Sequence, residues 1–393
     1  MTALKATLQP LFDWLVDGTP GTQSPMVIVG RLCADLRRAG VPIDRATAFV
    51  RTLHPHIAGR RFSWNPGLEV ATVDNLPWGG TTSKDFLVSP LPDLFATGAE
   101  HRSVLRGTGP LKYSGLEDVR KAGMTDYLAL PMKFMGGSVH AITFATAAPD
   151  GFTDEQVDAL RWVVRPLSRV AEALALMRTA VNLLNTYVGR NAGERILSGH
   201  IQRGETEKIR CVIWFSDLRG FTSMSGEKTP AETIAVLNEL FECQVPAIEE
   251  HGGEVLKFIG DGMLAIFAVG EQQTEQAAAN SAVSASVKAF KALAELNLAR
   301  KARGAESIRF GLSLHVGEVA YGNIGGSSRL DFTAIGSAVN LASRIEGLTG
   351  KLGKDLLLSE EVARLVTRPT RSVGSFELKG IAEPRTVFEL VEG

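Results

Sequence analysis

The sequence has little cysteine, with three residues in 393, and these lie far apart at Cys33, Cys211 and Cys243. Each has apolar neighbours, and no two have the spacing of a metal-binding pair. This pattern excludes a disulfide scaffold and a cysteine metal cluster. We therefore expect three reduced core residues, as is usual in the cytoplasm.

The chain also lacks an excess of charge of one sign and lacks a long apolar run. A formal net charge of -1 excludes a broad surface for nucleic acid or another polyanion. No apolar run approaches the roughly 20 residues that cross a bilayer. The first residues, MTALKATLQPLFDWLVDG, have neither the basic start nor the clean apolar run of a signal peptide. We expect a cytoplasmic protein with no membrane span and no nucleic-acid partner.

The length of the chain, 393 residues, predicts two or three domains. Residues 1–155 mix short strands, helices and Gly/Pro turns, and the stretches 126–134 and 138–146 predict a hairpin around MGG. Thr153 and Gln156 then form the capping box of a helix.

Residues 156–208 are expected to connect two domains. Apolar residues follow heptad spacing in two blocks, and the seam shifts phase between them. The first block is Val157, Leu160, Val164, Leu167, Ala171 and Leu174, and the second is Met177, Val181, Leu184 and Val188. Pro166 is expected to kink or break the helix. Residues 154–170 equally suit a last helix packed on its own sheet, 171–188 suit a dimeric connecting helix, and 189–208 form a connector rich in glycine and charge.

Residues 209–393 alternate strands and helices with hairpins between them. A helix from Thr229 has Pro230 at its first position and a capping box completed by Glu232. Two strands with a turn at Gly317 are predicted within 307–325, and a helix capped by Ser337 follows the strand LDFTAIG. This order predicts an α+β sandwich with helices on a mostly antiparallel sheet.

Two stretches place carboxylates where an apolar core would exclude them. Asp217 ends the apolar strand of WFSDLRGFT, and Asp261 lies in the turn of LKFIGDG, four residues after Lys257. Taken alone, Asp217 equally suits a helix cap and Asp261 an ordinary Asp-Gly turn. Taken together, two neighbouring carboxylates repel, and Mg²⁺ or Mn²⁺ would relieve that repulsion.

Two further stretches suit phosphate. The backbone N–H groups from Leu218 to Thr222 precede a helix and are able to cradle phosphate oxygens. In TAIGSAVNLASR, Asn340 and Arg344 are four residues apart on one helix face, and the arginine is able to grip a phosphate, although a surface arginine is the simpler interpretation.

The motifs FSDLRGFT, LKFIGDGMLAIF and FTAIGSAVNLASRIE, in this order and spacing, resemble the class III adenylate/guanylate cyclase catalytic domain over residues 209–393. The resemblance implies a ferredoxin-like fold and a head-to-tail homodimer with two composite sites. It further implies two Mg²⁺ or Mn²⁺ ions per site, bound near Asp217, Leu218 and Asp261.

The same resemblance implies the roles of the remaining site residues. Asn340 and Arg344 match the residues that stabilise the transition state, and they come from the protomer opposite the aspartates. Lys257 and Thr333 match the base-recognition pair of that second protomer. Lys379 matches a lysine for the terminal phosphates, and Gly220, Phe221 and Thr222 belong to the phosphate loop.

Thr333 places the chain in the threonine-type subgroup of that family, where the commoner residue is aspartate. Lys257 donates to adenine N1 and opposes the protonated N1 of guanine, whereas a threonine hydroxyl both accepts and donates. ATP is therefore the expected substrate, with 3′,5′-cyclic AMP and pyrophosphate as products, and a guanylate cyclase is the alternative. A catalytically silent nucleotide-binding regulator is a further alternative, and a diguanylate cyclase is disfavoured because its GGDEF turn is absent.

The stretches YLALPMKFMGGSVHAITFAT and PDGFTDEQVDAL resemble a GAF-type sensory domain. This resemblance implies a regulatory N-terminal domain with room for a small-molecule ligand that the sequence does not identify. His54, His56 and Trp64 are candidates to line such a pocket, although ordinary core or surface roles are the simpler interpretation.

Overall fold

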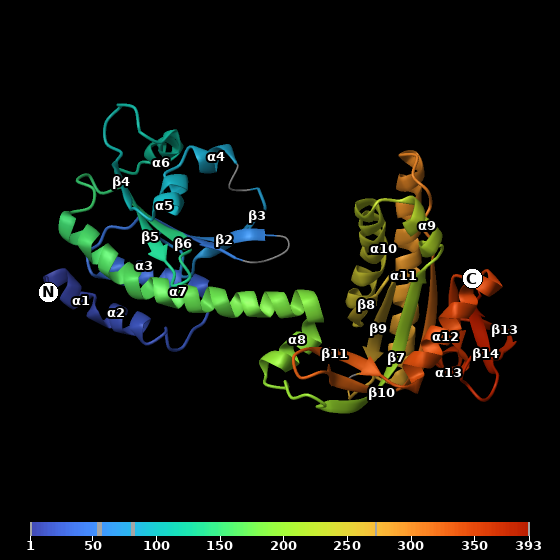
Figure 1. Cartoon of the computed structure of the whole chain (residues 1–393). Coiled ribbons are helices and arrows are strands. Elements are labelled where there is room, and N and C mark those ends of the chain that lie inside the picture. The colour runs from blue at the N-terminus through green and yellow to red at the C-terminus, as the bar shows by residue number, and fades with distance from the viewer. Residues whose placement is uncertain (1, 53–56, 80–82, 272, 392–393) are drawn as a thin grey trace. The chain divides into compact units, whose positions relative to one another are not determined.

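The computed structural model describes residues 2–52, 57–79, 83–271 and 273–391. The chain divides into two compact units, residues 1–183 and 184–393, each with its own sheet (Figure 1). Within the described residues, no helix has the length and apolar character needed to cross a membrane.

The N-terminal unit is built on an antiparallel sheet in the order β3-β2-β1-β6-β5-β4 (Figure 1). Its strands are β1 (Arg45–Arg51), β2 (Ile57–Trp64), β3 (Thr72–Pro77), β4 (His101–Val104), β5 (Asp126–Lys133) and β6 (Val139–Thr146). Its shorter helices are α1 (Ala3–Thr7), α2 (Gln9–Val16), α3 (Pro25–Arg38), α4 (Lys84–Leu87), α5 (Leu91–Thr97) and α6 (Glu117–Lys121), with the 3₁₀ turn η2 (Ser114–Leu116). The strands β5 and β6 confirm the predicted hairpin.

Apolar residues cover both faces of this sheet. Leu128 and Leu130 of β5 pack with α2, α3 and the helix α7 (Asp154–Val188), whereas Tyr127 and Ala129 pack with α4 and α5. Because side chains alternate along a strand, the two clusters lie on opposite faces. Trp64 is a satisfied core residue, since its indole donates to the Leu68 carbonyl at 2.8 Å. His54 and His56 lie outside the described residues.

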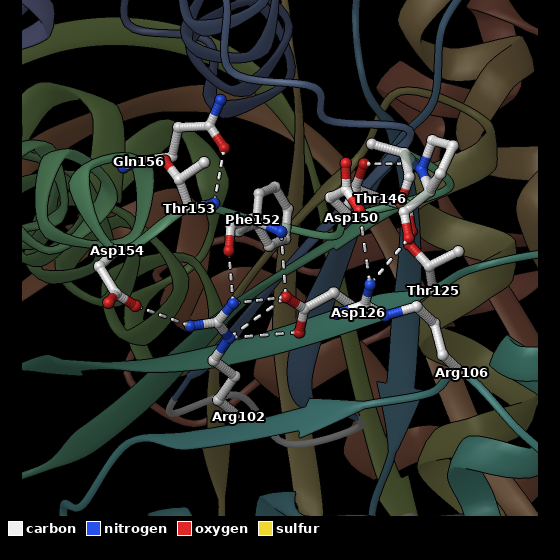
Figure 2. Close-up of polar contacts among 12 residues, drawn as sticks. Arg102, Arg106, Thr125, Asp126, Thr146, Asp150, Phe152, Thr153, Asp154 and Gln156 are labelled. Atoms are coloured by element: carbon white, nitrogen blue, oxygen red, sulfur yellow. Dashed lines mark hydrogen bonds and ion pairs between the residues drawn. The ribbon is translucent and has the colours of Figure 1, made fainter.

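A buried ion pair fixes the start of α7. Asp126 is 1% exposed, and Arg102 on β4 donates to its Oδ2 from Nη2 at 2.7 Å (Figure 2). The same carboxylate accepts from the Phe152 N–H at 3.0 Å, and the Phe152 carbonyl accepts from Arg102 Nη2 at 2.5 Å. The predicted capping box follows at once, with Thr153 and Gln156 bonded in both directions. The sheet and the first turn of α7 are thereby locked together.

The helix α7 is continuous from Asp154 to Val188, so Pro166 does not break it. Proline removes one backbone donor from a helix. Here Pro166 and its neighbours Val164 and Leu167 are buried, and this packing holds the helix together through the defect.

The C-terminal unit has a sheet in the order β13-β14-β12-β10-β7-β9-β8, and β11 pairs with β10 (Figure 1). Every pairing is antiparallel except β10 with β12. The strands are β7 (Thr206–Leu218), β8 (Glu254–Ile259), β9 (Gly262–Ala268), β10 (Phe310–Gly325), β11 (Leu330–Ile335), β12 (Leu356–Ser359), β13 (Thr370–Phe376) and β14 (Arg385–Leu390). The helices are α8 (Arg190–Leu197), α9 (Phe221–Glu227), α10 (Pro230–Glu250), α11 (Glu275–Ala302), α12 (Ser337–Leu352) and α13 (Glu360–Leu365).

Helices cover both faces of the central strands. Trp214 of β7 packs with α10 and α11, whereas Ile213 packs with α8 and the start of α12. This arrangement confirms the predicted α+β sandwich, and the capping box of Thr229 and Glu232 is present at the start of α10. Cys33, Cys211 and Cys243 are reduced and buried, as expected.

Two local predictions for this unit are wrong. Residues 310–325 form one strand rather than two, because Gly317 is a packing residue: a Cβ there would lie 2.6 Å from the Cβ of Ala338. Ser337 does not cap α12, whose N-cap is Gly336 without a side-chain bond. The connector 189–208 contains the helix α8, whose Ala192 is buried against the sheet.

Candidate active site

Asp217 and Asp261 lie side by side at one edge of the C-terminal sheet. Asp217 is the penultimate residue of β7, and Asp261 is in the two-residue turn between β8 and β9. The pairing of β7 with β9 reaches Ser216 and Met263, so the turn comes directly next to Asp217. The two carboxyl groups are hydrogen-bonded to each other.

Burial and a neighbouring charge both act on this pair of carboxyl groups. Burial and the charge of Asp261 raise the pKa of Asp217 to about 6, and burial also raises the pKa of Asp261. Below about pH 6 the pair therefore binds a proton more readily than an exposed aspartate does, and a divalent cation would compete with that proton. Within the described ranges, no group of three or more His, Cys, Asp or Glu side chains is placed to hold a metal. Two carboxylates completed by substrate phosphates suit Mg²⁺, which rarely uses an all-protein cage.

The loop after Asp217 turns sharply into α9. Leu218 is buried, and Gly220 adopts a left-handed φ of 76°, which other residues rarely adopt. Phe221 packs against the core below α10 and fixes the start of α9. Nothing is described of the Thr222 side chain. The predicted turn into a helix is present after Asp217, but the Arg219 N–H already donates to the Arg309 carbonyl at 2.9 Å and is not free to bind a phosphate.

Lys257 lies on β8 and forms an ion pair with Asp331 on β11. Thr333 is two residues further along β11, so it shares a face with Asp331. The Thr333 side chain is 2% exposed, and its hydroxyl has no hydrogen-bond partner within the described parts of the chain. An orphaned buried hydroxyl is destabilising unless a ligand satisfies it.

Asn340 and Arg344 are exposed on one face of α12. In the part of the chain that the structure describes, neither side chain has a hydrogen bond or an ion pair. The opposite face of α12 packs on the sheet through Ala342 and Ile345. Lys379 is exposed in the turn after β13, next to the buried Leu378.

The structure thus brings Asp217 next to Asp261. It also places Lys257, on β8, beside β11, the strand that carries Thr333. Asn340 and Arg344 form an exposed pair of their own, and Lys379 stands alone.

Sequence reasoning missed two carboxylates. Asp331 pairs with Lys257, and its signal was the alternation that places it on the face of Thr333. Glu346 lies near Asp217 and Asp261; burial and the charge of Asp217 raise its pKa to about 7. The sequence feature that could have revealed Glu346 is its position two residues after Arg344, which places it on the opposite face of α12.

A polar cluster joins α8 to the hairpin that carries Lys257. Glu254 at the start of β8 accepts from the Tyr321 hydroxyl at 2.9 Å, from Asn191 at 3.1 Å and from the Ala192 N–H at 3.3 Å. Arg195 forms an ion pair with Glu207 at 2.5 Å. These groups line a cavity of about 460 Å³, and they attach the connector directly to a strand of the site.

Residues 204–390 match the family described as the adenylate and guanylate cyclase catalytic domain. The adenylate cyclase of Anabaena cylindrica is 36% identical over 200 residues, covering 49% of this chain and 38% of that protein. Adenylate cyclase 1 of Rhizobium meliloti is 27% identical over 231 residues, covering 58% of this chain and 34% of that protein. The chain thus spans little more than a third of the length of these relatives.

Among solved structures, the adenylyl cyclase CyaB from P. aeruginosa is similar to this chain, with 28% identity and a TM-score of 0.44. The similarity covers 48% of this chain and 97% of that structure. The family match thus lies within the C-terminal unit, residues 184–393, and the N-terminal unit, residues 1–183, lies outside it.

Proposed function

We propose that this protein is an adenylate cyclase that converts ATP to 3′,5′-cyclic AMP and pyrophosphate at composite sites of a homodimer. The observation that carries the proposal is the half-buried pair of Asp217 and Asp261: burial raises the pKa of both carboxyl groups, and the charge of Asp261 raises that of Asp217 further. Such a pair destabilises the free protein and suits a site for divalent cations.

Asp217 and Asp261, with Leu218 beside them, would hold two Mg²⁺ or Mn²⁺ ions per site. When bound, such ions neutralise phosphate charge and acidify the ribose 3′-hydroxyl.

The base subsite explains the preference for ATP. Lys257 donates to adenine N1, and the orphaned Thr333 hydroxyl accepts from the adenine 6-amino group. Guanine presents a protonated N1 to the lysine and is disfavoured. Because a hydroxyl also donates, the Thr333 position tolerates the guanine carbonyl, which makes guanylate cyclase the competing assignment.

The reaction is an in-line displacement. The ribose 3′-oxygen forms a bond to the α-phosphorus, the bond from that phosphorus to the leaving oxygen breaks, and pyrophosphate departs. The proton of the 3′-hydroxyl leaves to water or to a substrate phosphate. Arg344 and Asn340 stabilise the charge that develops on the α-phosphate. Lys379 and the loop of Gly220, Phe221 and Thr222 hold the terminal phosphates.

The positions of two of these side chains support the proposed homodimer. Asn340 and Arg344 are exposed on α12, on the face turned away from the sheet that carries Asp217. We infer that they complete the site of a second copy, and that Lys257 and Thr333 act there with them. Each dimer then has two equivalent centres.

The N-terminal unit is proposed to be a GAF-like regulatory domain, covering residues 1–155, that acts through the connector 156–208. The second half of α7 exposes Leu176, Met177, Leu183 and Tyr187, an apolar seam that suits pairing with a second α7. The Glu254 cluster would then pass a movement of α8 to β8, the strand of Lys257.

The test is to supply the full chain with ATP or GTP, together with Mg²⁺ or Mn²⁺, and to identify the product. The proposal is supported if cyclic AMP is formed from ATP faster than cyclic GMP is formed from GTP. A faster formation of cyclic GMP would assign a guanylate cyclase. Nucleotide binding without any cyclic product would assign a silent regulator and overturn the proposal.

A further inference from the structure

Asp217 is flanked on both sides by glycine, on the face of the sheet that α12 covers. On β9, a Cβ at Gly262 would lie 2.9 Å from Asp217 Oδ1. On β10, the residue directly opposite Asp217 is Gly311. The two glycines therefore leave space on either side of the Asp217 carboxylate.

The space beside Gly311 is filled from α12. A Cβ at Gly311 would clash with the Glu346 carboxylate and with the Thr349 hydroxyl. Thr349 is buried and donates to Glu346 Oε1 at 3.2 Å, which holds the carboxylate in place. Opposed residues of an antiparallel pair have Cβ positions about 4.5–5.5 Å apart. Because Glu346 Oε1 is 2.4 Å from where a Cβ at Gly311 would be, it lies roughly 2–8 Å from the Cβ of Asp217.

We propose that Glu346 is a positioning residue of the metal centre: its carboxylate, held by Thr349 over Gly311, adds a third negative charge beside Asp217 and Asp261 and strengthens divalent-cation binding without coordinating the cation. The inference rests on the proposed function of that pair. Negative charge outside the ligand set raises cation affinity, and outer groups of metal sites commonly contribute this way. A purely structural glutamate would gain nothing from lying beside the Asp217 carboxylate, since the like charges repel in the free protein.

The test compares Glu346→Gln with wild type and with the matched control Glu295→Gln, an exposed residue of α11 on the other face of the sheet. Mn²⁺ alone is titrated into the full chain, and its dissociation constant is obtained by calorimetry. We expect Glu346→Gln to weaken Mn²⁺ binding about 10-fold, as is usual for an outer group of a metal site. Glu295→Gln should bind Mn²⁺ as wild type does.

The melting temperature supplies a second readout that a structural role would move in the opposite direction. Without metal at pH 8, Glu346→Gln should raise the melting temperature, because a repelled carboxylate is removed. With saturating Mn²⁺ the added stabilisation should be smaller than in wild type. Unchanged Mn²⁺ affinity, or a lower melting temperature of the metal-free variant, would overturn the inference. Glu346→Asp, which keeps the charge, should recover part of the affinity.

This experiment separates two failures. If wild type binds no Mn²⁺, the proposed metal pair itself is wrong. If wild type binds Mn²⁺ and Glu346→Gln binds it equally, only the role of Glu346 is wrong.

Discussion

The ammonium of Lys257 and the carboxylate of Asp331 form an ion pair that joins β8 to β11. The pair places Lys257 beside the strand that carries the orphaned hydroxyl of Thr333. A nucleobase that enters between them meets a donor and an acceptor already held in position.

Lys257→Ala should remove the contact to adenine N1. A hydrogen bond from a charged group contributes about 1.5–3 kcal/mol, so kcat/KM for ATP should fall about 10–100-fold. The ratio of ATP to GTP turnover should fall as well. Steady-state rates with both nucleotides provide the check, with the exposed Lys291→Ala as control. An unchanged nucleotide preference would show that Lys257 does not read the base.

Asp217→Asn should change how stability depends on pH in the metal-free protein. The raised pKa values of Asp217, Asp261 and Glu346 mean that the folded state binds more protons than the unfolded state between about pH 4 and 7. The free energy of unfolding therefore falls as pH rises through this window. The decline in melting temperature from pH 5 to 8 should be smaller in Asp217→Asn, and equal slopes would contradict the assigned repulsion.

Mixing Asp217→Asn with Arg344→Ala should restore activity that neither variant has alone. In a mixed dimer both changes fall in one centre, and the other centre is intact. Random exchange makes about half of the dimers mixed, so about a quarter of the wild-type rate is expected. Cyclic-product assays of the mixture, against each variant alone, give the answer. No recovery after verified exchange would mean that Asp217 and Arg344 of the same protomer act together in one centre.

Insertions near Ala180 should alter activity according to the rotation that they impose on α7. Three or four added residues turn the following helix by about −60° or +40°, whereas seven turn it by only about −20°. The first two variants should change the basal rate several-fold, and the seven-residue variant is the matched control. Thermal unfolding confirms that both units stay folded. Equal rates in all variants would exclude α7 as the route of regulation.

Arg102→Ala should destabilise the N-terminal unit because it leaves the Asp126 carboxylate buried without its partner. Breaking such a pair costs about 3–5 kcal/mol, and the lower end applies because Arg102 is partly exposed. Arg106→Ala, which breaks the exposed pair with Asp150 shown beside it in Figure 2, should cost at most about 1 kcal/mol. Hydrogen exchange of the β5 amides measures the loss of stability in both variants. Equal losses would contradict the stabilising role of the buried Arg102–Asp126 ion pair.

Sequence reasoning found what local signals determine. The capping boxes at Thr153 and Thr229, the β5–β6 hairpin and the β8–β9 hairpin, whose turn residues are Gly260 and Asp261, all depend on residues near each other in the chain. It failed where a distant partner decides. Gly317 has the composition of a turn, yet Ala338 of α12 makes it a packing site, and buried neighbours keep Pro166 within a helix.

The candidate site shows the same division. Asp217 and Asp261 stood out because charge interrupted apolar strands. Asp331 and Glu346 did not stand out, since each lies in an ordinary polar position. Their roles depend on which strand or helix face meets them in space, and that is a property of the fold.

The two faces of α12 limit which sequence changes in this helix can alter one property of the protein alone. Glu346 faces the sheet of its own chain, while Asn340 and Arg344 face outward. In the proposed dimer the single helix α12 therefore lies beside the metal ligands of one centre and contacts the substrate of the other. A sequence change that shifts α12 should therefore alter both the cation affinity of one centre and the transition-state contacts of the other.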